Sequence, residues 1–152
     1  MAEVWFYHLE REPLDSVLVK ILVGLRARGE RVCAHLRNAA TANALSQKLW
    51  SIEDTGFVVH GLDGDPAPER QPVLLTTKED AANAADYRFY CEGLMPETLD
   101  GVSRASILFE GADEAALASA RATWKRFKAD GCVVKYWRQN ESNRWEDQAA
   151  QD

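Results

Sequence analysis

The sequence predicts a single α/β domain in which helices flank a mostly parallel β-sheet. Short runs rich in β-branched and aromatic residues alternate with longer stretches whose apolar residues recur at helical spacing. Glycine and proline separate these segments, and strands that alternate with helices are typical of parallel sheets. A chain of 152 residues with 46% apolar residues suits one compact core.

The first half of the chain has the pattern strand, helix, strand, helix. Residues 4–9 form a β-branched and aromatic run, and a stretch with one apolar face then reaches Gly29, a candidate C-terminal stop. A second strand over residues 32–36 leads to a second helix over about residues 39–51, with Asn38 as its candidate N-cap.

The second half continues the alternation. Residues 57–60 are predicted as a third strand and residues 61–71 as a Gly/Pro-rich loop. The remaining predicted elements are strands over 72–77, 87–92, 105–109 and 132–137, a short alanine-rich helix over 78–86, and a helix from its N-cap Asp113 to about Ala129. The domain is expected to span residues 1–138, and residues 139–152, polar and without periodicity, are expected to form a flexible C-terminal tail.

Charge is spread unevenly along the chain. The net charge of −6 argues against a general nucleic-acid-binding protein, because such affinity comes mainly from Lys and Arg at phosphates. Residues 121–138 nevertheless contain six basic residues and one acidic residue, a local charge of 6 − 1 = +5. An acidic partner is expected for this basic region.

The cysteines and histidines lie apart from one another in the sequence. Cys33, Cys91 and Cys132 form no CxxC pair and have apolar or aromatic neighbours, so we expect buried reduced thiols and no metal. The longest apolar run is interrupted by Lys20 and Gly24, and the first residues lack the features of a signal peptide. A cytoplasmic protein with no membrane partner is expected.

Motifs for nucleotide chemistry are missing at the first strand. The following turn, Glu10-Arg11-Glu12-Pro13, has no glycine and places two carboxylates where phosphates would lie. The fold is therefore expected to resemble nucleotide-binding folds without their phosphate-binding loop. An enzyme of this fold type with an unknown substrate remains the alternative. His60 is its best acid–base candidate, although a histidine bonded to backbone at a strand end is the simpler interpretation.

Several segments together, in order and spacing, resemble a known family. They are Phe6-Tyr7-His8-Leu9, Leu49-Trp50, Gly56-Phe57-Val58-Val59-His60-Gly61, Gln71-Pro72-Val73-Leu74-Leu75-Thr76, Leu108-Phe109-Glu110-Gly111, and Arg121-Ala122-Thr123-Trp124-Lys125 followed by Gly131. In these segments the chain resembles the chi subunit family of bacterial DNA polymerase III, over about residues 4 to 137.

The resemblance implies a non-catalytic accessory subunit without a cofactor. Members of this family link the clamp loader, through a psi subunit, to the acidic, phenylalanine-terminated C-terminal tail of single-stranded-DNA-binding protein, so contact with DNA is indirect. The positions implied are Arg121, Trp124, Lys125 and Lys128 for the tail, and Trp50 and Phe57 for the psi surface. Two positions depart from the family pattern: Glu110 stands where Asn is frequent, and Val59 where Pro is frequent.

Helical geometry gives this assignment a physical basis. At about 100° per residue, Arg121, Lys125 and Lys128 fall within about 60° of arc, and Trp124 and Leu117 lie on the adjoining shoulder. A basic edge beside an apolar shoulder suits an acidic peptide that ends in an aromatic residue. The simpler interpretation is that the apolar residues belong to the core while the basic residues face solvent.

Overall fold

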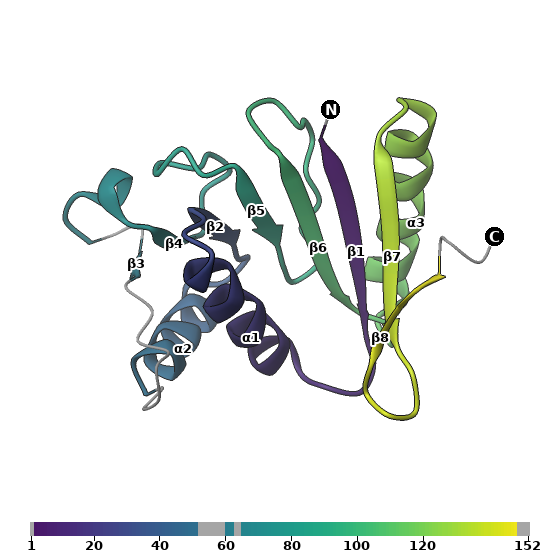
Figure 1. Ribbon diagram of the computed structural model, residues 1–152, viewed down its shortest axis with the longest axis horizontal. Helices are drawn as coiled ribbons and strands as arrows, with labels where there is room; N and C mark the ends of the chain where they lie inside the picture. The colour runs from purple at the N-terminus through teal and green to yellow at the C-terminus, as the bar shows by residue number, and fades with distance from the viewer. Residues whose placement is uncertain (1, 52–59, 63–64, 149–152) are drawn as a thin grey trace.

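The computed structural model describes residues 2–51, 60–62 and 65–148. Within these residues, eight strands form one sheet in the order β3-β4-β2-β5-β6-β1-β7-β8, and every neighbouring pair is parallel except β7 and β8 (Figure 1). The elements are β1 Glu3–Leu9, α1 Leu14–Ala27, β2 Val32–His35, α2 Ala39–Trp50, β3 Gly61–Leu62, a 3₁₀ turn at Pro68–Arg70, β4 Val73–Thr76, β5 Tyr87–Tyr90, β6 Arg104–Glu110, α3 Glu114–Ala129, β7 Val133–Gln139 and β8 Trp145–Asp147. The predicted fold class is confirmed.

The first strand lies inside the sheet. β1 pairs with β6 on one side and β7 on the other, so that Trp5 is opposite Ser106 and Lys135. β2 occupies the other half of the sheet, between β4 and β5. Parallel neighbours cannot be joined by tight turns, so the chain crosses between them through helices or long loops.

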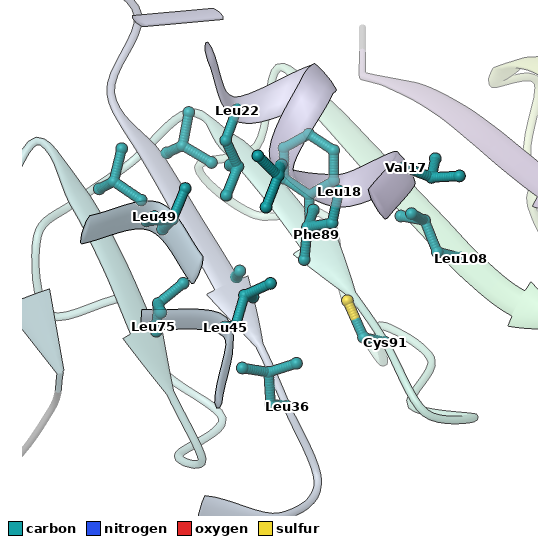
Figure 2. Packing of buried hydrophobic residues seen from close by; sticks show 14 of the residues in the cluster. Val17, Leu18, Leu22, Leu36, Leu45, Leu49, Leu75, Phe89, Cys91 and Leu108 are labelled. Atoms are coloured by element: carbon teal, nitrogen blue, oxygen red, sulfur yellow. The ribbon is translucent and has the colours of Figure 1, made fainter. Parts of the chain in front are cut away.

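The helices cover the two faces of the sheet separately. α1 and α2 pack on the first face, where Leu18 and Leu22 point toward Phe89, Val17 lies beside Leu108, and Leu45 of α2 belongs to the same cluster (Figure 2). These side chains are almost completely buried. Burial of one such side chain contributes about 1.5–3 kcal/mol, so the helical apolar stripe accounts for the position of α1.

α3 covers the second face, beside β7 (Figure 1). Its buried stripe of Ala116, Ala120 and Phe127 belongs to one cluster with Phe6 of β1 and Ile107 of β6. Small alanines let the helix backbone approach the strands closely, while the opposite side of the helix stays exposed.

Residues 78–86 form turns, so the prediction of a short helix there is wrong. Asn83 is buried, and its Nδ2 donates to the carbonyl oxygens of Val32 and Gln71, both at 3.0 Å. Ala84 has a left-handed φ of 53°, which a helix does not allow. Helix propensity is a weak preference, and these tertiary hydrogen bonds override it.

Residues 139–147 belong to a β-hairpin, whereas the sequence predicted a flexible tail from residue 139. β7 extends to Gln139, and β8 pairs antiparallel with it. The turn is closed by the Asn140 N–H, which donates to the Arg144 carbonyl at 2.8 Å. Trp145 packs edge-on against Tyr7 at 5.3 Å and is partly buried against the core cluster of the first face.

The third predicted strand, residues 57–60, lies outside the described residues except for His60. The described strand β3 is Gly61–Leu62, inside the segment predicted to be a loop. It pairs with β4 at Leu74 and Leu75 and forms one edge of the sheet.

Candidate functional site: the outer face of α3

α3 begins at the predicted cap. The Asp113 side chain accepts hydrogen bonds from the N–H groups of Ala115 and Ala116, both at 3.1 Å. Helix N-terminal N–H groups lack partners within the helix, so this cap fixes the first turn. Gly131, with a φ of 84°, follows its C-terminal end.

Arg121, Lys125 and Lys128 are all exposed. We refer to these three residues as the α3 basic face. Because α3 buries the opposite stripe against the sheet, the three cations face away from the core. Lys128 Nζ lies 5.5 Å from the centre of the Trp124 ring, a cation–π distance.

Trp124 is half-buried beside the basic face. Its ring lies 5.7 Å from that of Phe6 and 5.9 Å from that of Tyr136 on β7. Trp124 therefore belongs both to the packing of α3 on the sheet and to the surface between α3 and β7. The sequence pattern of α3 alone does not point to Tyr136, which lies on another element. The available signal was strand alternation: Tyr136 follows Val134 by two residues, so both side chains lie on the same side of the last parallel strand.

The charge of Arg121 reaches into this aromatic cluster. The His8 Nδ1 and Tyr136 hydroxyl are hydrogen-bonded at 2.8 Å. Burial lowers the pKa of His8, and the positive charges of Arg138 and Arg121 lower it further. Burial raises the pKa of Tyr136, whereas Arg138 and Arg121 oppose that rise.

The other basic residues of the 121–138 region do not join the α3 basic face. Arg126 donates to the Pro96 carbonyl at 2.6 Å. Lys135 lies on the first face, 5.3 Å from the Trp5 ring. The Arg138 Nε and Nη2 atoms donate to Glu10 at 3.0 and 2.9 Å.

β6 ends at Glu110, and Gly111 follows it in the short connection to α3. Glu110 is exposed, and among the described residues none of the ion pairs joins it to a lysine. Gly111 has a steric role, because a Cβ at that position would overlap the His8 ring at Nε2. The glycine of this segment therefore leaves room for the buried histidine.

The turn after β1 is occupied by its own carboxylates. Besides the pair between Glu10 and Arg138, Glu12 accepts from Lys20 at 2.7 Å, from Ser16 at 3.1 Å and from Gln139 at 2.8 Å. The hydrogen bond from Arg138 lowers the pKa of Glu10, and those from Lys20 and Gln139 lower the pKa of Glu12. Carboxylates paired with the chain's own cations therefore occupy this turn.

A carboxylate from another part of the chain also lies at the N-terminus of α2. Asn38 stands at the predicted N-cap position, but its side chain makes no capping hydrogen bond. Glu92, which follows β5 in the next loop, instead accepts from Arg37 N at 3.2 Å, Asn38 Nδ2 at 2.8 Å and Thr41 Oγ1 at 3.2 Å. A negative charge is favourable at this end of a helix.

The predicted psi surface is described only in part. Trp50, the last residue of α2, is 54% exposed, and its ring lies 4.8 Å from that of His60. Phe57 and Val59 lie outside the described residues. The structure therefore places one exposed aromatic residue at the predicted surface and does not bring the second one into view.

The histidines and cysteines are distributed through the core. His60 Nε2 is hydrogen-bonded to Ser46 Oγ at 2.8 Å. Cys33 and Cys91 are buried and Cys132 is half-buried, and none of the three forms a disulfide. In the described part of the chain, no three His, Cys, Asp or Glu residues are grouped so that they could hold a metal.

The fold and this site together define an open, mostly parallel α/β domain whose first turn carries carboxylates and whose last long helix presents a basic face. The family model for the DNA polymerase III chi subunit, HolC, matches residues 1–135, and the chain belongs to this family. Membership of this family makes the protein an accessory subunit in DNA replication.

A solved structure gives a more distant comparison. The C-terminal domain of Dbp5 from S. cerevisiae, determined bound to Gle1 and IP6, matches with a TM-score of 0.59 and 15% sequence identity, over 90% of each chain. At this identity the likeness concerns the fold alone. Comparison with the curated proteins gives no match. Among the described residues, no helix has both the length and the apolar character needed to cross a membrane.

Proposed function

We propose that the protein is a non-catalytic adaptor of the DNA polymerase III holoenzyme. In this proposal it binds the acidic C-terminal tail of single-stranded-DNA-binding protein through the α3 basic face and binds a psi subunit of the clamp loader through a surface that includes Trp50. It acts in the cytoplasm and meets DNA only through these partners. Membership of the chi family supports this assignment.

One observation carries the tail-binding proposal: an exposed row of cations beside a half-buried aromatic ring. Arg121, Lys125 and Lys128 supply hydrogen-bond donors for aspartate side chains and for a terminal carboxylate. Trp124 and Tyr136, whose rings are 5.9 Å apart, supply an apolar contact for a terminal phenylalanine. The rest of the chain is acidic, so the basic face is where an acidic peptide gains most.

The test is binding of a fluorescent peptide that contains several aspartates and ends in phenylalanine. Arg121→Glu should weaken this binding strongly, since loss of one charge-assisted hydrogen bond removes about 1.5–3 kcal/mol, a roughly tenfold to hundredfold change, and charge reversal removes more. Arg28→Glu, an exposed arginine at the end of α1, is the matched control. Equal affinities of Arg121→Glu and wild type at low salt would place the site elsewhere.

The psi surface is tested with Trp50. Its 54% exposure leads us to expect that Trp50→Ala keeps the thermal unfolding midpoint within about 2 °C while lowering the amount of psi subunit that co-purifies. Aromatic residues at interface centres often account for more than 1 kcal/mol of binding. Tail-peptide affinity serves as the control and should not change. Retention of psi by the folded variant would remove Trp50 from the interface.

A further inference from the structure

A hollow of about 490 Å³ lies at the carboxyl ends of β2, β4 and β5. We refer to it as the carboxyl-end hollow. His35 and Tyr90 contribute to its lining from the strands, and the loops over residues 77–79 and 93–98 flank it. In open parallel sheets, ligands bind outside the carboxyl ends of strands, and a volume of roughly 300–1,000 Å³ is usual for small-molecule sites. No residue of the α3 basic face lines the hollow.

Three cations line the hollow: Arg37, Lys78 and Arg88. The two arginines are held by backbone carbonyls through their Nε atoms, Arg37 by Glu92 at 3.0 Å and Arg88 by Ala85 at 3.1 Å. These bonds orient the planar guanidinium groups, whose terminal nitrogens match the oxygens of phosphates and carboxylates. Two acidic residues, Glu79 and Glu97, also line the hollow, so the three cations leave a local excess of one positive charge.

His35 adds a second, independent feature. It is only 2% exposed, and its ring stacks on that of Tyr90 at 4.8 Å. Its Nδ1 lies 2.9 Å from the Lys78 carbonyl oxygen, an acceptor, so Nδ1 carries the proton of the neutral ring. Burial lowers the pKa of His35, which favours this neutral form.

The other ring nitrogen, His35 Nε2, is buried without a hydrogen-bond partner among the described residues. In the neutral ring Nε2 has a lone pair and can only accept a hydrogen bond. Buried polar atoms are almost always paired, and each exception calls for an explanation. A ligand that donates a hydroxyl to Nε2 would satisfy it.

We propose that the carboxyl-end hollow binds a small phosphorylated polyol, with its phosphate held by Arg88, Arg37 and Lys78 and a hydroxyl donating to His35 Nε2. The arginines select the anion, and the histidine selects a ligand that carries a donor next to that anion. The cations alone would bind any small anion, and the histidine alone would accept a hydrogen bond from any hydroxyl, so both groups are needed to select such a compound.

Three probes separate these contributions in calorimetric titrations: ribose 5-phosphate, inorganic phosphate and ribose. Ribose 5-phosphate should bind with one-to-one stoichiometry at least tenfold more tightly than inorganic phosphate, and ribose should not saturate. No saturable binding of ribose 5-phosphate, or an affinity equal to that of inorganic phosphate, overturns the proposal.

Two variants assign the site. Arg88→Met should weaken ribose 5-phosphate at least tenfold, whereas Arg28→Met, at the exposed end of α1, should leave its affinity unchanged. His35→Asn keeps a donor for the Lys78 carbonyl and removes the Nε2 acceptor, so it should lower ribose 5-phosphate affinity toward that of inorganic phosphate without altering the latter. Wild-type affinity of a folded Arg88→Met protein overturns the assignment. Because the tail peptide uses other residues, its binding by the same variants tests the proposed function separately.

Discussion

At the scale of single residues, Gly111 shows how a small side chain can be required for space. An ideal Cβ there would overlap the His8 ring, which is itself buried and bonded to Tyr136. We expect Gly111→Ala to lower the free energy of unfolding by about 1–3 kcal/mol, as overpacking typically does. Urea unfolding measures this change.

Gly24 is the matched control for that substitution. It lies in α1 with nothing within 4 Å of an added Cβ. Gly24→Ala should therefore raise the unfolding free energy by about 0.5–1 kcal/mol, because alanine favours the helix and restricts the unfolded chain. A loss of stability in both variants would show that space beside His8 is not the cause.

His8 and His35 should make stability depend on pH. Burial lowers the pKa of each below the ordinary value of 6.5. In the unfolded chain each takes up a proton near 6.5, and in the folded protein only at lower pH. The unfolding free energy should thus be fully present above pH 6.5 and decrease as pH falls below it.

His8→Asn tests this dependence, since asparagine retains a polar group near the Tyr136 hydroxyl but does not titrate. The variant should lose less unfolding free energy than wild type between pH 7 and about 5.5. At about pH 8, where histidine is neutral in both states, any difference reports packing alone. A slope as steep as that of wild type would mean that His8 titrates alike in both states.

At the scale of elements, Glu92 replaces the expected cap of α2. Its carboxylate accepts from Arg37, Asn38 and Thr41 around the first turn, although its own φ is 59°. Glu92→Ala should lower the unfolding free energy by about 1–2 kcal/mol, in the range of lost helix caps. It should also speed hydrogen exchange in the first turn of α2.

Glu97 provides the comparison for this prediction. It is an exposed carboxylate in the same connection between β5 and β6, and Glu97→Ala should change stability by less than about 0.5 kcal/mol. Equal effects of the two substitutions would indicate a general loss of negative charge instead of a lost cap.

The elements that the sequence predicts well are those whose pattern depends on local spacing. The apolar stripes of α1 and α3 and the Asp113 cap are examples, because period and capping are properties of a few neighbouring residues. Residues 78–86 and 139–147 were mispredicted because distant partners decide them: Asn83 bonds to Val32 and Gln71, and Trp145 packs on Tyr7.

At the scale of the whole molecule, the basic residues also divide into those placed by local spacing and those placed by distant partners. Exposure of Arg121, Lys125 and Lys128 follows from helical phase, so the sequence predicted it. The sequence could not predict where the remaining basic residues lie, because their positions depend on neighbours that are distant in the chain. Arg138 is paired with Glu10 at the far end of the sequence, and Lys135 faces the other side of the sheet.

The position of β1 between β6 and β7 also affects how the protein is made. Trp5 is paired with residues 101 and 130 positions later in the chain (106 − 5 and 135 − 5). At about 5–20 residues per second, a ribosome needs roughly 6–26 s to synthesise the more distant neighbour. Until then the aromatic first strand has no partner on that side, and such distant contacts slow folding. The sheet can close only late in translation, and until then the unpaired edge of the first strand is open to association with other chains.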